Sequence, residues 1–146
     1  MSLANAAENN LMLLLFNATT WNNWAQNDAT APLTDIRVSL HTGDPGEAGA
    51  QNTSETTYGG YVRVLVARTT VGYTVAANQA TNAAAITFVE ATTGPQTVTF
   101  WGMGEATTGA GVLIVSGSID TPTAGLVVNI GVQPQFAATQ LDINLD

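Results

Sequence analysis

The residues with the most capacity for chemistry lie in one short segment, HTGDPGE. It holds the only histidine of the chain, His41, followed closely by Asp44 and Glu47. Imidazole and carboxylate groups could bind zinc, but a dependable zinc site shows several histidines or cysteines at fixed spacing. The Asp-Pro-Gly sequence at 44–46 is typical of a turn. We therefore expect a strand that runs into a turn here, rather than a catalytic or metal-binding site.

The remaining sequence offers little other chemistry. A serine nucleophile would need His41 as its base, and VSGSI at 115–119 lacks the flanking glycines of a G-x-S-x-G motif. GMGEATTGAG has neither the lysine nor the following helix of a phosphate-binding loop. Glu90 and Glu105 could act as a glycosidase pair only if the fold brings them together. We therefore expect no catalytic, cofactor-binding or metal-binding residues.

The composition indicates a protein that works inside an assembly. Only 10% of the 146 residues are charged, against roughly 25% in an ordinary soluble domain. Such a surface suits a protein covered by copies of itself or by other subunits. Three arginines and no lysine stand against eleven acids, for a net charge of −8. Three cations cannot neutralise a row of phosphates. We therefore expect that the protein binds neither nucleic acid nor an anionic membrane surface.

The residue types and segments that the sequence lacks indicate where the protein is assembled. There is no cysteine, which excludes disulfides and thiol chemistry. The longest apolar run, LMLLLF, is too short to span a bilayer, and it lacks the flanks of a secretory signal. We therefore expect assembly in a cytoplasm.

The N-terminal segment predicts a short amphipathic helix over about residues 3–16, with Ser2 as its N-cap. The expected apolar stripe consists of Leu3, Ala7, Leu11, Leu14 and Leu15. The last turn is apolar on nearly every side, which predicts partners around it. In the irregular connection that follows, Trp21 and Trp24 are the expected packing anchors.

From Leu33 onward, alternation of apolar and polar residues predicts strands. In DIRVSLH, Ile36, Val38 and Leu40 alternate with polar residues, and YVRVLVAR follows the same pattern. Further strands are predicted in AAITFV, QTVTFWGM, GVLIVSGSI, LVVNIGV and LDINLD. Residues 43–60 predict a long, polar loop without a strand, which is hard to pack.

These elements predict a mainly β protein, an antiparallel β-sandwich or barrel-like sandwich with a short N-terminal α-helix. We expect a single domain over residues 1–146, with the helix and its arm in residues 1–32 and the sandwich in residues 33–146. Natural sheet edges are usually guarded by charged residues or proline. These strands carry almost no such guards, so we expect neighbouring subunits to cover the edges.

The aromatic residues raise one alternative, a sugar-binding platform. The candidates for it are Trp21, Trp24, Tyr58, Tyr61, Tyr73 and Trp101. Core packing is the more frequent role of such residues, because each buries a large apolar area. Trp101 lies inside an apolar run, which favours the core.

Several short motifs follow one another along nearly the whole chain. An N-x-x-E-x-x-L pattern at Asn5, Glu8 and Leu11 opens it, and that segment ends at Phe16. VSLHTGDPGE, GGYVR, NAAAITF, TVTFWGM, EATTGAGVLIVSGSI and PQFAATQLDINLD come next, in that order. In this order the motifs resemble a family of small tail-fibre-like or decoration-type virion structural proteins of tailed bacteriophages. The resemblance implies a non-enzymatic protein of the virion, assembled in the host cytoplasm.

The chain has no stalk, coiled coil or repeated shaft, which favours a capsid decoration or cement protein that stabilises the head by bridging capsid subunits. A tail-fibre, collar or neck component is the alternative, and a carbohydrate-binding host-recognition module is a further one. The expected partners are copies of the chain itself in a homotrimer and the major capsid protein or other virion proteins. A host surface sugar is the alternative partner.

The expected contact residues are apolar residues of the helix, two tryptophans and the three arginines. They are Leu11, Leu14, Leu15, Phe16, Trp21, Trp24, Arg37, Arg63 and Arg68. As the only cations of an acidic chain, the arginines are expected to form ion pairs within or between subunits.

Overall fold

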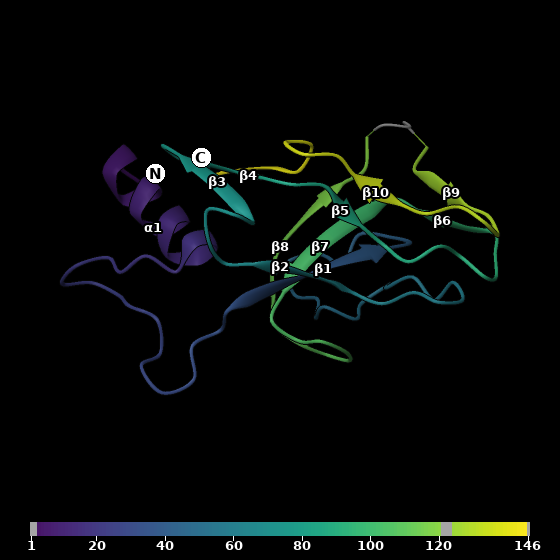
Figure 1. The fold of residues 1–146 in the computed structure, drawn as a ribbon, viewed down its shortest axis with the longest axis horizontal. Coiled ribbons are helices and arrows are strands. Elements are labelled where there is room, and N and C mark those ends of the chain that lie inside the picture. Colours follow the sequence, from purple (N-terminus) through teal and green to yellow (C-terminus); the bar gives the residue numbers. More distant parts are fainter. Residues whose placement is uncertain (1–2, 121–123, 146) are drawn as a thin grey trace. The chain divides into compact units, whose positions relative to one another are not determined.

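The computed structural model describes residues 3–120 and 124–145. One α-helix precedes a series of short strands (Figure 1). The elements are α1 (Asn5–Asn17), β1 (Asp35–His41), β2 (Val64–Ala67), β3 (Tyr73–Ala76), β4 (Gln79–Asn82), β5 (Ile86–Thr87), β6 (Gln96–Val98), β7 (Phe100–Gly104), β8 (Leu113–Ser118), β9 (Leu126–Val128), β10 (Gln135–Phe136) and β11 (Asp142–Asn144). The predicted fold class is confirmed: the protein is mainly β and antiparallel, consistent with a β-sandwich, with a short N-terminal helix.

The chain forms two compact units. The first comprises residues 1–36, 66–86 and 136–146, and the second comprises residues 37–65 and 87–135. The single domain expected for the whole chain stays a prediction.

In the first unit, α1 packs against β3 and β4 (Figure 1). These two strands form a hairpin in which Tyr73 pairs with Asn82, and β11 adds a third strand beside β4. The hairpin turns at Ala77, which has a positive φ of 56°. Apolar side chains from the helix and the sheet fill the core between them. Its fully or almost fully buried members include Met12, Phe16, Tyr73, Ala80 and Leu141.

The second unit contains β7, β8 and most of β1 of the main sheet. Strand order in this sheet is β2-β1-β7-β8. In the β1–β7 register, Val38 faces Met103 and Leu40 faces Trp101, and β7 pairs with β8 on its other side. A separate pair, β6 and β9, adds the buried residues Val98 and Val128.

The helix differs from its prediction in bounds and in buried face. It begins at Asn5, after an N-cap position at Ala4 that makes no side-chain capping bond. Ser2, the predicted N-cap, lies outside the described residues. The buried residues are Glu8, Met12 and Phe16 instead of the expected leucine stripe. These three lie four residues apart, so they share one face of the helix, and that face meets Tyr73 and its neighbours.

The strands of the main sheet are more deeply buried than their alternation predicts. Ser39 and His41 were expected on a polar face of β1, yet both are fully buried. Both faces of β1 are therefore covered, which hydrogen bonds between its polar side chains make possible. The strand predicted from Tyr61 to Arg68 shortens to β2, because Arg63 turns inward and Val62 is exposed.

Three strands were missed altogether, namely β3, β4 and β10. The loop over residues 43–60 has no strand, as predicted, but it is well packed. Gln51, Thr56 and Tyr58 within it are buried. The expectation that this loop is hard to pack is therefore wrong, because its polar side chains find partners inside the second unit.

Gly102 marks the tightest packing beside the buried histidine. A Cβ atom at this position would lie 2.6 Å from His41 Nε2 and 3.0 Å from Ser39 Oγ. Only glycine therefore fits opposite Ser39 in the β1–β7 register.

Gly102→Ala should lower the free energy of unfolding by about 1–3 kcal/mol, the usual cost of an overpacked core. Gly43→Ala is the matched control, because its Cβ would meet nothing closer than 3.7 Å. Urea denaturation of both variants at one protein concentration measures the difference. Equal stabilities would contradict the packing that we describe.

Candidate functional site

Arg68 holds the end of α1 in place in the first unit. Its guanidinium donates to the backbone carbonyls of Leu14 (2.6 Å), Leu15 (2.7 Å) and Leu33 (2.7 Å). The last carbonyls of a helix have no partner within the helix, and they carry partial negative charge. Arg68 is a buried cation that donates to two of these helix carbonyls. It satisfies their hydrogen bonding and also interacts favourably with the helix dipole. Burial lowers the pKa of Arg68 from its ordinary value, but an arginine stays charged in a protein.

Within the described chain, Arg68 thus forms a clamp on three carbonyls, and the ion pair expected for it stays a prediction. The clamp fixes the segment that leaves the helix. Ala18 follows in the left-handed conformation at φ 53°, and Thr19 donates to the carbonyl of Leu13 at 3.1 Å. This geometry is a common helix C-terminus, and it directs the chain toward the tryptophans.

The two tryptophans form a tight turn, residues 21–25, which we call the tryptophan turn. Trp21 and Ala25 exchange two backbone hydrogen bonds at 2.8 and 2.9 Å, and Asn23 has a φ of 67°. The indole rings of Trp21 and Trp24 stack with centroids 5.6 Å apart. Trp24 is 79% exposed, so the expectation that it anchors the packing of the chain is wrong.

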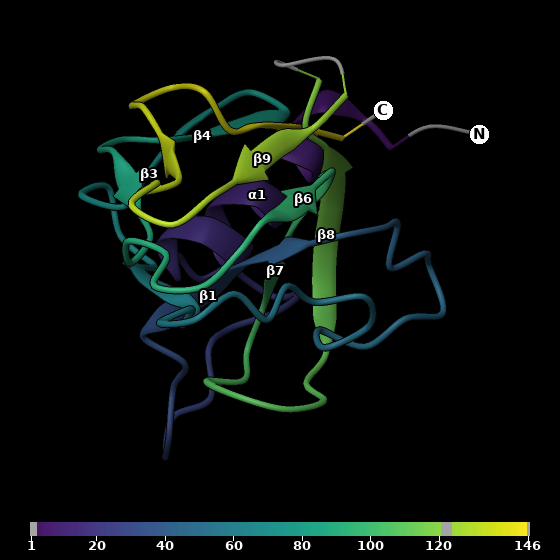
Figure 2. The same cartoon turned by 90° about the vertical axis from the view of Figure 1, so that its right-hand side faces the viewer.

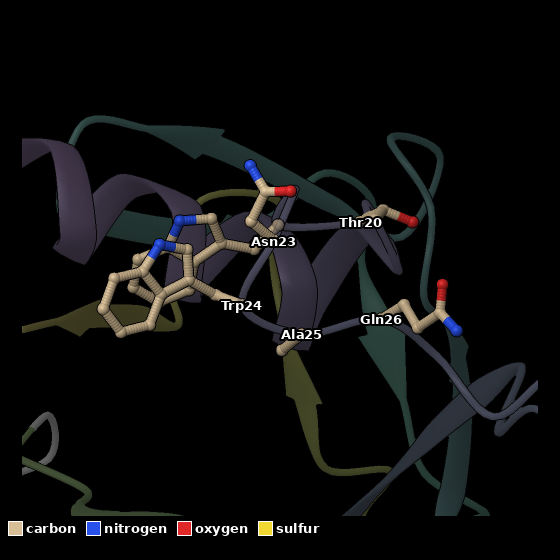
Figure 3. A pocket seen from close by; sticks show the side chains of 6 residues that line it. Thr20, Asn23, Trp24, Ala25 and Gln26 are labelled. Carbon is tan, nitrogen blue, oxygen red and sulfur yellow. The ribbon is translucent and has the colours of Figure 1, made fainter.

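A hollow of about 230 Å³ adjoins the tryptophan turn, lined by residues 20, 21 and 23–26. Figure 3 shows the Asn23 amide close to the stacked rings, while the side chains of Thr20 and Gln26 point away from them. The turn therefore presents an ordered aromatic surface to solvent. An exposed tryptophan held in a fixed conformation loses little entropy on binding a partner.

The other helix residues expected at an interface differ in how deeply they are buried. Leu11, Leu14 and Leu15 are half-buried. Phe16 is buried, and its ring meets the Tyr73 ring edge-on at 5.0 Å. Phe16 thus packs inside the first unit, while contact of the leucines with another subunit stays a prediction.

In the second unit, Arg63 forms the expected ion pair within the chain. Its Nε and Nη2 bind the two carboxylate oxygens of Glu55 at 2.7 and 2.6 Å. The same guanidinium donates to the carbonyls of Ala106 (2.8 Å) and Gly109 (2.7 Å). The hydrogen bond with Glu55 raises the pKa of Arg63, against the effect of burial.

Tyr61 completes this cluster. Its hydroxyl donates to Glu55 Oε1 at 2.8 Å and accepts from the backbone N–H of Leu40 at 3.1 Å. Burial raises the pKa of the Tyr61 hydroxyl, and burial also raises that of Tyr58 to about 12. A buried ion pair is stable only when its remaining donors and acceptors are satisfied. Here the remaining groups bind Ala106 and Gly109 in the loop after β7, Glu55 in the loop over residues 43–60, and Leu40 of β1. The cluster therefore fixes these two loops to β1.

Arg37 and Gln51 make a second link between β1 and the loops. Arg37 donates through Nε to Thr107 Oγ1 at 3.4 Å. The buried Gln51 amide donates to the Arg37 carbonyl at 2.9 Å and accepts from the Ala106 N–H at 3.0 Å. The sequence alone did not indicate the roles of Gln51 and Glu55, because a polar residue in a loop gives no signal of its distant partner. Tyr61 was considered only as a candidate for the sugar-binding platform.

His41 lies at the end of β1, and the turn predicted after it is present. Asp44 Oδ1 accepts from the Gly46 N–H at 2.8 Å. His41 Nδ1 is 2.8 Å from the Thr53 carbonyl, which can only accept, so Nδ1 carries the hydrogen. Its Nε2 is 2.8 Å from Ser39 Oγ. This distance suits a nucleophile–base pair, but both side chains are fully buried, which closes the pair to a substrate.

The described residues bring no other chemistry together. Within them, no group of three or more histidine, aspartate or glutamate side chains is placed to hold a metal ion. No helix in residues 3–120 and 124–145 is long and apolar enough to cross a membrane. The sugar-binding platform, raised as an alternative, loses three of its six candidates, because Tyr58, Tyr73 and Trp101 are buried in cores.

The comparisons with known proteins indicate a structural role. A family model described as Podophage GP4 fiber I protein gp80 matches residues 2–144. The chain belongs to this family of phage fibre proteins, and it is therefore a structural protein of the virion. No curated protein matches the sequence.

Replacing Arg68 by methionine keeps the length of the side chain but leaves three carbonyls without their donor. We expect the free energy of unfolding to fall by about 2–4 kcal/mol, given the usual worth of hydrogen bonds to a charged group. The free energy of unfolding of Arg68→Lys should lie between those of Arg68→Met and the parent protein, because an ammonium group cannot reproduce the planar, forked donors of a guanidinium.

Urea denaturation measures both variants, with Val71→Ala as a control in the same unit. Val71 is 76% exposed, so its truncation should change little. A loss below about 0.5 kcal/mol for Arg68→Met, typical of a surface site, would contradict the clamp.

The stability of the protein should fall as the pH drops from 7 to 5. Burial lowers the pKa of His41 below the ordinary histidine value of about 6.5, so the folded state keeps the ring neutral while the unfolded chain takes up a proton. Stability is lost wherever the unfolded state binds more protons, here below about pH 6.5, with a slope of at most about 1.4 kcal/mol per pH unit.

His41 is the only histidine and no cysteine is present, so His41→Gln should remove most of this pH dependence. Urea midpoints of both proteins at pH 5, 6 and 7 provide the measurement. An equal slope in the variant would assign the effect to other groups.

Proposed function

We propose that this chain is a fibre component of a podophage virion, and that it attaches to its neighbours through the first unit. The observation that carries the proposal is the family match, which extends over residues 2–144. A fibre component needs a rigid fold and a surface for attachment. The two arginine clusters provide the rigidity, since each fixes several backbone carbonyls with charge-assisted bonds.

The proposed attachment surface combines the tryptophan turn with the half-buried Leu11, Leu14 and Leu15 of α1. Tryptophan is among the residues that contribute most binding energy at protein interfaces. An apolar surface also suits this chain, because a net charge of −8 opposes contacts that depend on charge alone.

A capsid decoration or cement protein is the second candidate. The observation that favours it is the length of α1, which has 13 residues and is the one helix in the described part of the chain. A coiled-coil shaft requires a pattern sustained over several heptads. A homotrimer, the major capsid protein as a partner and assembly in the host cytoplasm all stay predictions under either candidate.

The location can be tested by sedimentation of labelled protein with purified heads, tails and complete particles that lack it. Saturable binding to tails or collars would support the fibre proposal. Binding to heads at a fixed copy number would establish the decoration role, and binding to neither would contradict both.

Trp24→Ala should reduce this binding by more than tenfold with little loss of stability, because the side chain is mostly exposed and acts as a contact residue. Val71→Ala is the matched control, since Val71 is an equally exposed apolar residue of the first unit. A Phe16 variant is less informative, because the buried ring supports the fold. Unchanged binding of Trp24→Ala would exclude the tryptophan turn from the attachment surface.

A further inference from the structure

The tryptophan turn lies in the connection between α1 and β1, a long loop without helix or strand (Figure 2). The Trp24 ring stacks on Trp21 at an interplanar angle of 26°, so the second indole covers one of its faces. Because 79% of Trp24 is exposed, its opposite face is open to solvent. An aromatic face is the negative side of the ring quadrupole. The turn therefore presents an ordered, electron-rich surface.

The first unit, which carries this surface, is strongly acidic. Its three segments contain five acids and a single arginine. That arginine is Arg68, which is buried. Asp28 lies just after the turn and is exposed, and hydrogen bonds from two backbone N–H groups lower its pKa, so it stays ionised at neutral pH. The charge of this unit attracts a cation and repels an acidic partner.

The open face of Trp24 is a site for such a cation. Tryptophan is the side chain that binds cations most strongly through its ring face. Among the described residues, Trp21 is the one ring partner of Trp24. A cation on the open face therefore has to come from another molecule. A second copy of this chain is a poor source, because it is acidic and two of its three arginines are buried.

The hollow beside the rings favours a guanidinium over a sugar. Its lining contains no charged residue. In Figure 3, only the Asn23 amide lies close to the stacked rings, while Thr20 and Gln26 point away from them. A sugar needs several polar groups that converge on its hydroxyls. A guanidinium is planar and weakly hydrated, so it stacks on an indole and needs few acceptors.

We propose that the tryptophan turn binds an arginine side chain of a neighbouring virion protein. The guanidinium stacks on the open face of Trp24 and donates to the amide oxygen of Asn23. This inference rests on the proposed attachment through the first unit, and it names the partner's chemistry as a basic segment that contains arginine. Tryptophan and arginine are both enriched among the residues that dominate binding at interfaces, and such residues tend to pair across them.

Hexa-arginine and hexa-lysine peptides test this chemistry, because they carry equal charge and differ in the shape of the cation. The indole N–H signals of the three tryptophans report the site of binding by NMR. Hexa-arginine should shift the Trp24 signal saturably and leave the signal of the buried Trp101 unchanged. Hexa-lysine should bind more weakly, because an ammonium group is compact, strongly hydrated and does not stack.

Trp24→Leu keeps an apolar side chain and removes the aromatic face. By calorimetry, its affinity for hexa-arginine should fall by about threefold to fivefold, the usual strength of an exposed cation–π contact. Trp24→Phe keeps a smaller aromatic face and should retain part of the affinity. Val71→Ala changes an equally exposed apolar residue of the same unit, and it should bind as the parent protein does. Circular dichroism checks that all variants are folded.

Two results would overturn the inference. One is equal binding of the two peptides by the parent protein, and the other is an unchanged affinity of Trp24→Leu for hexa-arginine, which would assign the binding to general charge attraction. Sedimentation with tails tests the attachment separately. A protein that prefers arginine but binds no tails contradicts the proposed attachment alone, whereas one that binds tails without this preference contradicts the arginine contact alone.

Discussion

Each compact unit contains one buried guanidinium that binds several backbone carbonyls. Arg68 binds three backbone carbonyls of the first unit, and Arg63 binds a carboxylate and two carbonyls of the second. Removing a charge from water costs several kcal/mol unless nearly every donor finds a partner. The surrounding loops must therefore hold their carbonyls in fixed positions. Few strands of this protein exceed five residues, and these clusters supply the order that longer sheets provide elsewhere.

The surface that remains outside these clusters carries few cations. With three cations in all, of which two are buried, the surface is dominated by neutral polar residues, acids and isolated apolar residues. Such a surface forms few salt bridges with partners. Contacts then depend on aromatic and aliphatic side chains such as those of the tryptophan turn and α1. This distribution agrees with a family of phage fibre proteins, whose members function as parts of a larger particle.

The buried polar residues also explain how loops without regular structure remain ordered. From its sequence, the segment over residues 43–60 was expected to be a long, polar loop that is hard to pack. Glu55 and Gln51 connect it to Arg63 and to the carbonyl of Arg37, while Thr53 accepts the hydrogen bond of His41. Each bond removes a polar group from water and satisfies it at once. The loop thus becomes part of the second unit.

The sequence by itself determined the features that depend on neighbours along the chain. Local periodicity identified α1, β1 and most strands, and the Asp-Pro-Gly sequence identified the turn after His41. Composition and motif order identified a virion protein, because these properties belong to the whole chain. Tertiary structure alone decided the buried face of α1, the hairpin of β3 and β4, and the partners of the arginines. These depend on contacts between residues far apart in sequence: Arg68 lies more than fifty positions from Leu15, and neither residue carries a signal of the other.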